Sequence, residues 1–241
     1  MTTVSTGKNR IYWVRDNIIA EDFPDIDSAL DDPDGLLAIG GDLEPERLLQ
    51  AYRRGIFPWY SEGQPIMWWS PNPRWIIYPE SVNISRSLQK TMRKNIFKVT
   101  FDKAFTKVIK ACAEPREKQA GTWITFDIIR NYEKLHEDGY AHSVECWQGN
   151  RLVGGLYGIC IGRIFFGESM FSQISDASKV ALVHLSNLCQ KWQFPLIDCQ
   201  IYSPHLESMG ATPISRQKFR EILSIHCNIN ERLDWPDITG P

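Results

Sequence analysis

The sequence predicts a mixed α/β domain, of α+β or α/β class, built on a central sheet and preceded by a smaller N-terminal part. After Pro79, residues with helical spacing and short apolar runs follow one another in the order helix, helix, hairpin, strand, helix, strand. Before Pro79, Asp, Pro and Trp dominate and indicate turns. The 241 residues are 43% hydrophobic, which suffices for one large domain or one domain with a smaller partner.

In the N-terminal part, an apolar run at residues 36–39 ends at two glycines. Residues 42–55 predict a helix, with Pro45 in its first turn and Gly55 at its C-terminus. Residues 56–75 then contain four of the nine tryptophans and four prolines, which predicts a rigid loop. Its aromatic rings either form the core of a small domain or offer flat faces to a nucleobase or an apolar substrate.

In the larger part, Phe101, Phe105, Val108, Ile109 and Cys112 keep helical spacing, as do the apolar residues of 128–135 before the stop at Gly139. The remaining elements are a hairpin, a strand, a long helix and a further strand, at residues 141–147 with 152–159, 164–166, 176–192 and 196–201.

Two glycines, Gly154 and Gly155, lie inside the second strand of the predicted hairpin. They indicate a bulge or a close backbone approach, and we expect a ligand to lie against this strand.

Several classes of protein are disfavoured by the sequence. No apolar run approaches the roughly 20 residues that span a bilayer, and residues 1–6 do not begin a signal peptide, so we expect a cytoplasmic protein without membrane contact. The six cysteines form no Cys-x-x-Cys pair and predict buried, reduced thiols and no metal site. Cys199 is expected to point into the core. A P-loop, a zinc-protease motif and a nucleophile elbow are all lacking.

The net charge of −2 conceals two segments of opposite sign. Residues 21–46 carry ten acidic side chains and no basic one, whereas residues 86–110 carry eight basic side chains and one acidic one. Ser85 is expected to cap a helix that places Arg86, Lys90, Arg93 and Lys94 on one face. This face either contacts nucleic-acid phosphates or is an ordinary solvated surface.

Three polar residues are candidates for catalysis. Glu168 follows one apolar run, and Asp198 with Gln200 ends another. A strand-helix-strand unit brings such ends side by side, where burial and repulsion raise a carboxyl pKa towards that of a general base. An amide such as Gln200 accepts a hydrogen bond from an attacking amine. The alternative is that each carboxylate pairs with a basic residue or caps a turn.

Six segments, in order along the chain, resemble the bacterial leucyl/phenylalanyl-tRNA–protein transferases. They are GLLAIGGDL (35–43), YRRGIFPW (52–59), WWSPNPR (68–74), GTWIT (121–125), GESMFS (167–172) and IDCQ (197–200). The resemblance implies a small N-terminal domain at residues 10–75 and a larger acetyltransferase-like (GNAT-like) domain with a central mixed sheet at residues 76–241, together an α+β protein.

The resemblance also implies an aminoacyltransferase of the N-degron pathway. Such an enzyme moves Leu or Phe, possibly Met, from aminoacyl-tRNA to the α-amine of a protein that begins with Arg or Lys. That transfer marks the protein for degradation. Because the aminoacyl ester is already activated, no ATP, metal or other cofactor is expected.

Roles for particular residues follow from the same resemblance. Gln200 and Asp198 draw a proton from the attacking amine, and Glu168 positions the reacting groups. The aminoacyl and adenosine site is formed by Tyr52, Trp59, Trp123, Leu156, Phe165, Gly167, Ser169, Met170, Phe171 and Leu185. Leu156 and Leu185 depart from the Met and Phe of the family pattern, so the preference among Leu, Phe and Met stays open. The basic face of residues 86–94 contacts tRNA phosphates.

Two other functions stand as alternatives. An acetyl-CoA-dependent N-acetyltransferase would share the fold, but residues 172–179 contain no Gly-rich loop for a pyrophosphate. A noncatalytic RNA-binding module would use only the basic helix and the tryptophans. The acidic segment carries a further hypothesis, that part of it faces the basic N-terminus of the acceptor.

Overall fold

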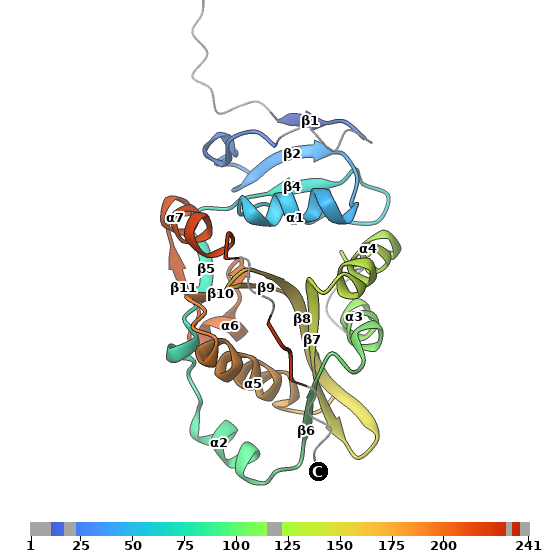
Figure 1. Cartoon of the computed structure of the whole chain (residues 1–241), viewed down its shortest axis with the longest axis vertical. Coiled ribbons are helices and arrows are strands. Elements are labelled where there is room, and N and C mark those ends of the chain that lie inside the picture. The colour runs from blue at the N-terminus through green and yellow to red at the C-terminus, as the bar shows by residue number, and fades with distance from the viewer. Residues whose placement is uncertain (1–10, 17–22, 115–121, 230–232, 237–241) are drawn as a thin grey trace, which may run out of the picture.

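The computed structural model describes residues 11–16, 23–114, 122–229 and 233–236. Two sheets organise these residues, a small one near the N-terminus and a large one in the centre of the molecule (Figure 1). None of the helices in these ranges combines the length and the hydropathy needed to cross a bilayer.

The small sheet has the strand order β1-β2-β4-β3. Only β1 and β2 are parallel. Its elements are β1 Tyr12–Val14, a 3₁₀ turn Ile26–Ser28, β2 Leu36–Gly40, α1 Pro45–Arg53, β3 Phe57–Pro58 and β4 Met67–Trp69. Figure 1 shows α1 between this sheet and the rest of the protein.

The large sheet has the order β11-β5-β10-β9-β8-β7-β6 and is mixed, because β9 and β10 are its parallel pair. Its strands are β5 Arg74–Ile77, β6 Lys98–Phe101, β7 Ala141–Gln148, β8 Arg151–Ile161, β9 Ile164–Ser172, β10 Leu196–Gln200 and β11 Thr212–Ile214. The connecting helices are a 3₁₀ turn Pro79–Ser81, α2 Arg86–Arg93, α3 Phe105–Ala113, α4 Phe126–Glu137, α5 Ala177–Lys191, α6 Pro204–Ser208 and α7 Arg216–His226.

Helices cover both faces of the large sheet, with α5 on one face and α3 with α4 on the other (Figure 1). Burial follows these two layers: one hydrophobic cluster joins α5 to the sheet, and the other runs from α3 and α4 into the small sheet. The predicted α+β class, the small N-terminal part and the central mixed sheet are confirmed. The predicted domain boundary after residue 75 falls inside β5, and the division into domains stays a prediction.

Most predicted elements are confirmed, with shifts at their ends. Asp176 and Trp192 flank α5 as expected, and the hairpin is β7 with β8. The helix predicted from residue 42 begins only at Pro45, because Glu44 is extended, with ψ at 145°, and its backbone N–H donates to Asp42 Oδ1 at 3.1 Å. Two predictions are wrong. Phe101 ends β6 rather than joining the next helix, and the loop predicted at 56–75 contains β3, β4 and the start of β5. There Phe57 of β3 is paired with Trp69 of β4.

The glycines of β8 mark close backbone approach, as expected, but neighbouring elements of the fold occupy the space where a ligand was expected. A Cβ on Gly154 would lie 2.5 Å from the Cβ of Ala177, so α5 fills that space. A Cβ on Gly155 would lie 2.6 Å from the carbonyl oxygen of Val144. These glycines therefore serve the packing of α5 and β7 against β8.

Candidate active site

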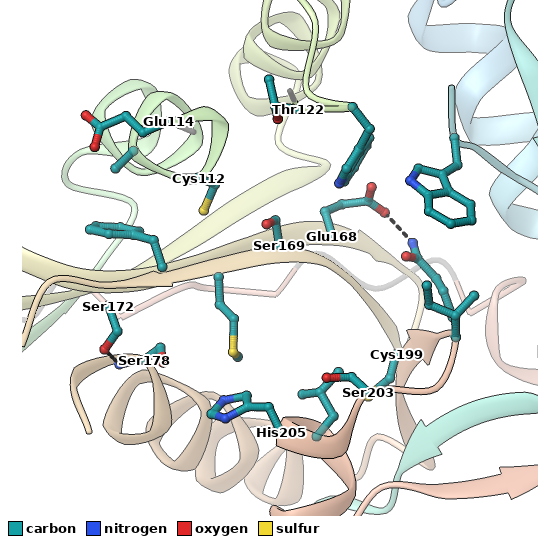
Figure 2. Close-up of a pocket in the computed structure, with 18 of the residues that line it drawn as sticks. Cys112, Glu114, Thr122, Glu168, Ser169, Ser172, Ser178, Cys199, Ser203 and His205 are labelled. Atoms are coloured by element: carbon teal, nitrogen blue, oxygen red, sulfur yellow. Dashed lines mark hydrogen bonds between the residues drawn. The ribbon is translucent and has the colours of Figure 1, made fainter. Parts of the chain in front are cut away.

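The parallel strands β9 and β10 part at the centre of the large sheet. Their pairing ends where Asp198 lies opposite Phe166. Beyond this point β9 continues along β8 as far as Ser172, while β10 ends at Gln200. Glu168 is therefore inside a strand, whereas the sequence predicts it at the end of a shorter one. The wedge between the two strands holds a cavity of about 730 Å³ (Figure 2).

The cavity is lined by β9, β10 and the segments around them. Polar lining comes from Glu114, Thr122, Glu168, Ser169, Ser172, Gln173, Ser178, Gln200, Ser203 and His205, and aromatic or apolar lining from Phe57, Pro58, Trp59, Ala111, Cys112, Trp123, Met170, Phe171, Cys199, Ile201, Tyr202 and Leu206. None of these described residues is Lys or Arg. Among the described lining residues, the acidic side chains are Glu114 and Glu168.

Glu168 has three hydrogen-bond donors around its carboxylate. The Tyr52 hydroxyl donates to Oε1 at 2.7 Å, and the Gln200 amide nitrogen donates to the same oxygen at 2.9 Å. The Tyr132 hydroxyl donates to Oε2 at 3.2 Å and also contacts the Tyr52 hydroxyl. Burial raises the pKa of Glu168 to about 7, although the hydrogen bonds from both tyrosines and Gln200 oppose this shift. This carboxyl therefore titrates near neutral pH.

Gln200 joins the two strands at the point where they separate. Its φ of 66° lies in the left-handed region, which non-glycine residues rarely adopt, and its backbone N–H donates to Asp198 Oδ1 at 3.0 Å. Because the side-chain nitrogen donates to Glu168, the side-chain oxygen is left to accept. The dashed line that starts at Glu168 in Figure 2 marks this contact. The pair therefore offers a carboxylate and an amide oxygen side by side.

Asp198 is fully buried and does not line the cavity. Its two oxygens accept from Arg74, Nε at 2.8 Å and Nη2 at 2.7 Å, so the two side chains form a bidentate ion pair. Arg74 also donates to the carbonyl of Gly55, and its guanidinium lies 4.7 Å from the ring centroids of Phe57 and Phe219. The alternative interpretation of the sequence, in which a carboxylate pairs with a basic residue, is therefore the one that fits the contacts of Asp198 with Arg74.

Two residues of the site, Arg74 and Tyr132, are missed by reasoning from the sequence. Reasoning from the sequence gives Arg74 only as the last residue of an aromatic, Pro-rich motif. A charged residue at the start of the apolar run 74–78 is nevertheless a signal for a buried ion pair. Helical spacing places Tyr132 on the apolar face of a helix and gives its hydroxyl group no role. Both contacts join residues far apart in the chain.

The predicted substrate-binding residues divide into two groups. Trp59, Trp123, Ser169, Met170 and Phe171 line the cavity, and Trp59 is 40% exposed. The others, Tyr52, Leu156, Phe165, Gly167 and Leu185, do not line it. Leu156, Phe165 and Leu185 are buried together between the sheet and α5, and Met170 packs against that cluster. The structure therefore brings five of the ten to the cavity wall.

The basic helix forms as predicted. Ser85 caps α2 by accepting the backbone N–H of Leu88, and the side chains of Arg86, Lys90, Arg93 and Lys94 are exposed. Thr91, on the same helix, donates to Asp176 at the start of α5 at 2.8 Å. Since Ser178, two residues further on, lines the cavity, α2 is connected to the cavity rim.

Four of the ten acidic residues of segment 21–46 form ion pairs within the chain. Asp42 binds Arg47, Glu44 binds Lys134, and both Asp25 and Asp27 bind Arg220. Glu21 and Asp22 lie outside the described residues, as do Gly121 of the GTWIT motif and the first ten residues. These ion pairs engage part of the segment within the chain, and contact of the remainder with an acceptor stays a prediction.

All six cysteines are buried and free, as predicted. Cys199 belongs to the α5 cluster and also touches the cavity, and burial raises the pKa of its thiol. In the described ranges, no group of three or more His, Cys, Asp or Glu side chains is arranged to hold a metal ion.

Comparison with known families supports the motif resemblance. Residues 76–224 match the family described as leucyl/phenylalanyl-tRNA protein transferase, and residues 41–72 match the N-terminal domain described for it. The chain belongs to this family. It is therefore an enzyme that transfers an aminoacyl group from tRNA to protein.

Relatives that carry this family's name cover most of the chain. The protein of Cellvibrio japonicus is 54% identical over 90% of this chain and 93% of its own length. That of Stutzerimonas stutzeri is 55% identical over 93% and 99%, and that of Aromatoleum aromaticum is 61% identical over 82% and 84%.

Solved structures give more distant likenesses. An aminoglycoside acetyltransferase from a soil metagenomic sample is 12% identical with a TM-score of 0.35, covering 53% of this chain and 88% of that one. L-PGS from Bacillus licheniformis is 10% identical with a TM-score of 0.39, covering 78% and 63%. Neither likeness bears on the chemistry of this chain.

Proposed function

We propose that this enzyme moves Leu or Phe, with Met as a further donor, from aminoacyl-tRNA to the α-amine of proteins that begin with Arg or Lys, and so marks them for N-degron degradation in the cytoplasm. The observation that carries this proposal is the Glu168–Gln200 pair in the wedge between β9 and β10. An amide oxygen beside a carboxylate is suited to an amine nucleophile. The carboxylates of the cavity, with no Lys or Arg among its described lining residues, favour a cationic acceptor.

The aminoacyl-tRNA end is proposed to enter the same cavity. Trp59 and Trp123 provide flat faces for the terminal adenosine, and Met170 and Phe171 provide apolar surface for the aminoacyl side chain. Leu156, Phe165 and Leu185 would form the layer beneath Met170, with Gly167 at the strand junction and Tyr52 behind Glu168. The exposed basic face of α2 would hold tRNA phosphates close to this entrance.

The chemistry requires no additional activation. An aminoacyl ester of tRNA reacts with an amine once the two are held together, so positioning in the cavity replaces ATP or a cofactor. We propose Glu168, Gln200 and Asp198 as the functional centre, with the first two in contact with the reacting groups.

A transfer assay tests this function. Labelled Leu-tRNA or Phe-tRNA is mixed with matched peptides that begin with Arg, Lys or Glu, with and without ATP and CoA. We expect transfer to the Arg and Lys peptides only, with no requirement for ATP or CoA. A requirement for acetyl-CoA would support the acetyltransferase alternative, and tRNA binding without transfer would support the RNA-binding module.

A further inference from the structure

Asp198 is poorly placed to receive a proton from the cavity. It is fully buried, and both of its oxygens accept from Arg74. Oδ1 accepts a third hydrogen bond from the backbone N–H of Gln200. Protonating Asp198 would weaken the ion pair and leave a buried guanidinium without its full partner. A substrate amine in the cavity therefore meets no exposed oxygen of this carboxylate.

Glu168 has the access that Asp198 lacks. It lines the cavity, and its Oε1 shares a hydrogen bond with the side chain of Gln200. The donors that surround it are neutral: two tyrosine hydroxyls and one amide. Protonation of Glu168 therefore leaves no unpaired charge in the protein.

We propose that Glu168 accepts the proton of the acceptor's α-ammonium group, and that Asp198 is a positioning residue that acts through Gln200. The proposal rests on the function stated above and assigns the proton differently from the family resemblance, which gave it to Gln200 and Asp198.

The step balances in protons and bonds. The acceptor's ammonium group donates one proton to Glu168, while a second N–H donates a hydrogen bond to the Gln200 oxygen. The neutral amine then attacks the ester carbonyl, so that a C–N bond forms and the C–O bond to the ribose breaks. Glu168 passes its proton to the departing ribose oxygen, and the nitrogen releases its one excess proton to water. The products are an amide, a free ribose hydroxyl and one proton in solvent, and Glu168 is again a carboxylate.

The other charged and titratable groups around Glu168 are consistent with this role. Tyr52 comes from α1, Tyr132 from α4 and Tyr157 from β8, and burial raises the pKa of each phenol well above its usual value. The fourth group, Asp198 on β10, opposes the ionised form of Glu168 by repulsion. Because burial raises the pKa of Glu168 to about 7, its carboxylate is a stronger base than an exposed one and is still ionised in part at neutral pH.

Asp198 holds the backbone of Gln200 in place beside Glu168. The Gln200 backbone has a positive φ, a conformation that needs to be held by its surroundings, and the Asp198 carboxylate accepts its N–H. Arg74 in turn fixes Asp198 with two hydrogen bonds. The ion pair thereby aims the Gln200 side chain at Glu168.

The test is the pH dependence of kcat/KM for an Arg-initiated peptide, with Leu-tRNA saturating. In the unmodified enzyme, we expect the rate to rise with pH through an apparent pKa near 7. Glu168→Gln should remove this rising limb of the pH profile, so that only the titration of the peptide amine is left. It should also slow transfer at pH 7 by about 100-fold or more. Asp198→Asn should lower the rate and keep the limb. If it does not fold, the double variant Arg74→Met with Asp198→Asn, which removes both charges, serves instead.

A matched control is Glu145→Gln, since Glu145 is also a buried carboxyl with a raised pKa but does not line the cavity. Its pH profile should keep the limb. An acceptor with an aminooxy group in place of the α-amine is almost entirely unprotonated at pH 7. With this acceptor, the ratio of the transfer rates of the unmodified enzyme and Glu168→Gln should therefore fall at least tenfold.

Two results would overturn the assignment: a limb that persists in Glu168→Gln and disappears in the Asp198 variants, or an aminooxy acceptor that leaves the Glu168→Gln defect unchanged. Failure of the proposed function is distinguishable from these, because then the unmodified enzyme itself would not prefer the Arg-initiated peptide.

Discussion

Arg74 and Asp198 form a buried ion pair, and we expect its loss to destabilise the folded protein. Each is almost completely buried, at 1% and 0% exposure of the side chain, and each satisfies the other's charge. We expect Arg74→Met to lower the free energy of unfolding by about 3–5 kcal/mol, because it leaves the Asp198 carboxylate buried without a counter-ion.

Urea unfolding measures this loss. The double variant Arg74→Met with Asp198→Asn should lose clearly less than the sum of the two single variants. Additive losses would mean that the two charges do not stabilise one another.

A second prediction concerns how Glu168 makes the stability of the folded protein depend on pH. Its pKa rises from an ordinary 4.5 in the unfolded chain to about 7 in the folded protein, so the folded state binds the proton more tightly. This contribution to stability is complete below pH 4.5 and is lost as pH rises through 7, a change on the order of 3 kcal/mol.

Thermal or urea unfolding between pH 5 and 8 checks this prediction. Glu168→Gln should show a smaller fall in stability over that range than the unmodified protein. An unchanged fall would mean that Glu168 does not titrate there.

Among the elements, β8 and α5 depend on the glycine at which they meet. A Cβ at Gly154 would lie 2.5 Å from Ala177 Cβ and 3.2 Å from the carbonyl oxygen of Phe171, so the start of α5 would have to move. We expect Gly154→Ala to lower the unfolding free energy by about 1–3 kcal/mol.

Adding Ala177→Gly to Gly154→Ala tests the cause of that loss. It removes the facing methyl group, and unfolding experiments should show partial recovery beyond the small cost of glycine in a helix. No recovery would place the strain in the strand itself.

Most elements were predictable from local pattern, and the exceptions have physical reasons. The hairpin of β7 and β8 has turn residues between two apolar runs, and α5 is a long segment rich in apolar residues, so the sequence indicates both directly. The sequence places Phe101 in the next helix because it precedes that helix at helical spacing, while its actual conformation is set by pairing of β6 with β7. The sequence predicts too short a strand for β9, because Gly167 and Glu168 interrupt the apolar run although pairing with β8 continues.

The basic helix α2 lies at the opposite end of the molecule from the small sheet (Figure 1). If α2 contacts tRNA phosphates, replacing Arg86, Lys90 and Arg93 by Gln should weaken tRNA binding. It should also reduce the log–log salt slope by about one unit for each phosphate that the variant no longer binds.

Binding measured at several salt concentrations gives the slope. Replacing Lys218 and Arg220 on α7 is the control, because these exposed cations are paired with Glu221, Asp25 and Asp27. An unchanged slope in the α2 variant would make that helix an ordinary solvated surface.

The sequence by itself determined the family, the mixed α/β architecture and the residues Glu168, Asp198 and Gln200, because motifs, periodicity and caps are local properties. Only the tertiary structure decided how those three residues divide. Arg74, which lies 124 residues before Asp198 in the chain, binds that carboxylate and keeps it from the cavity. Tyr52 and Tyr132 donate hydrogen bonds to Glu168 from two different helices. Which carboxylate faces the cavity depends on where β9 and β10 part, and that point is set by strand pairing between segments distant in the chain.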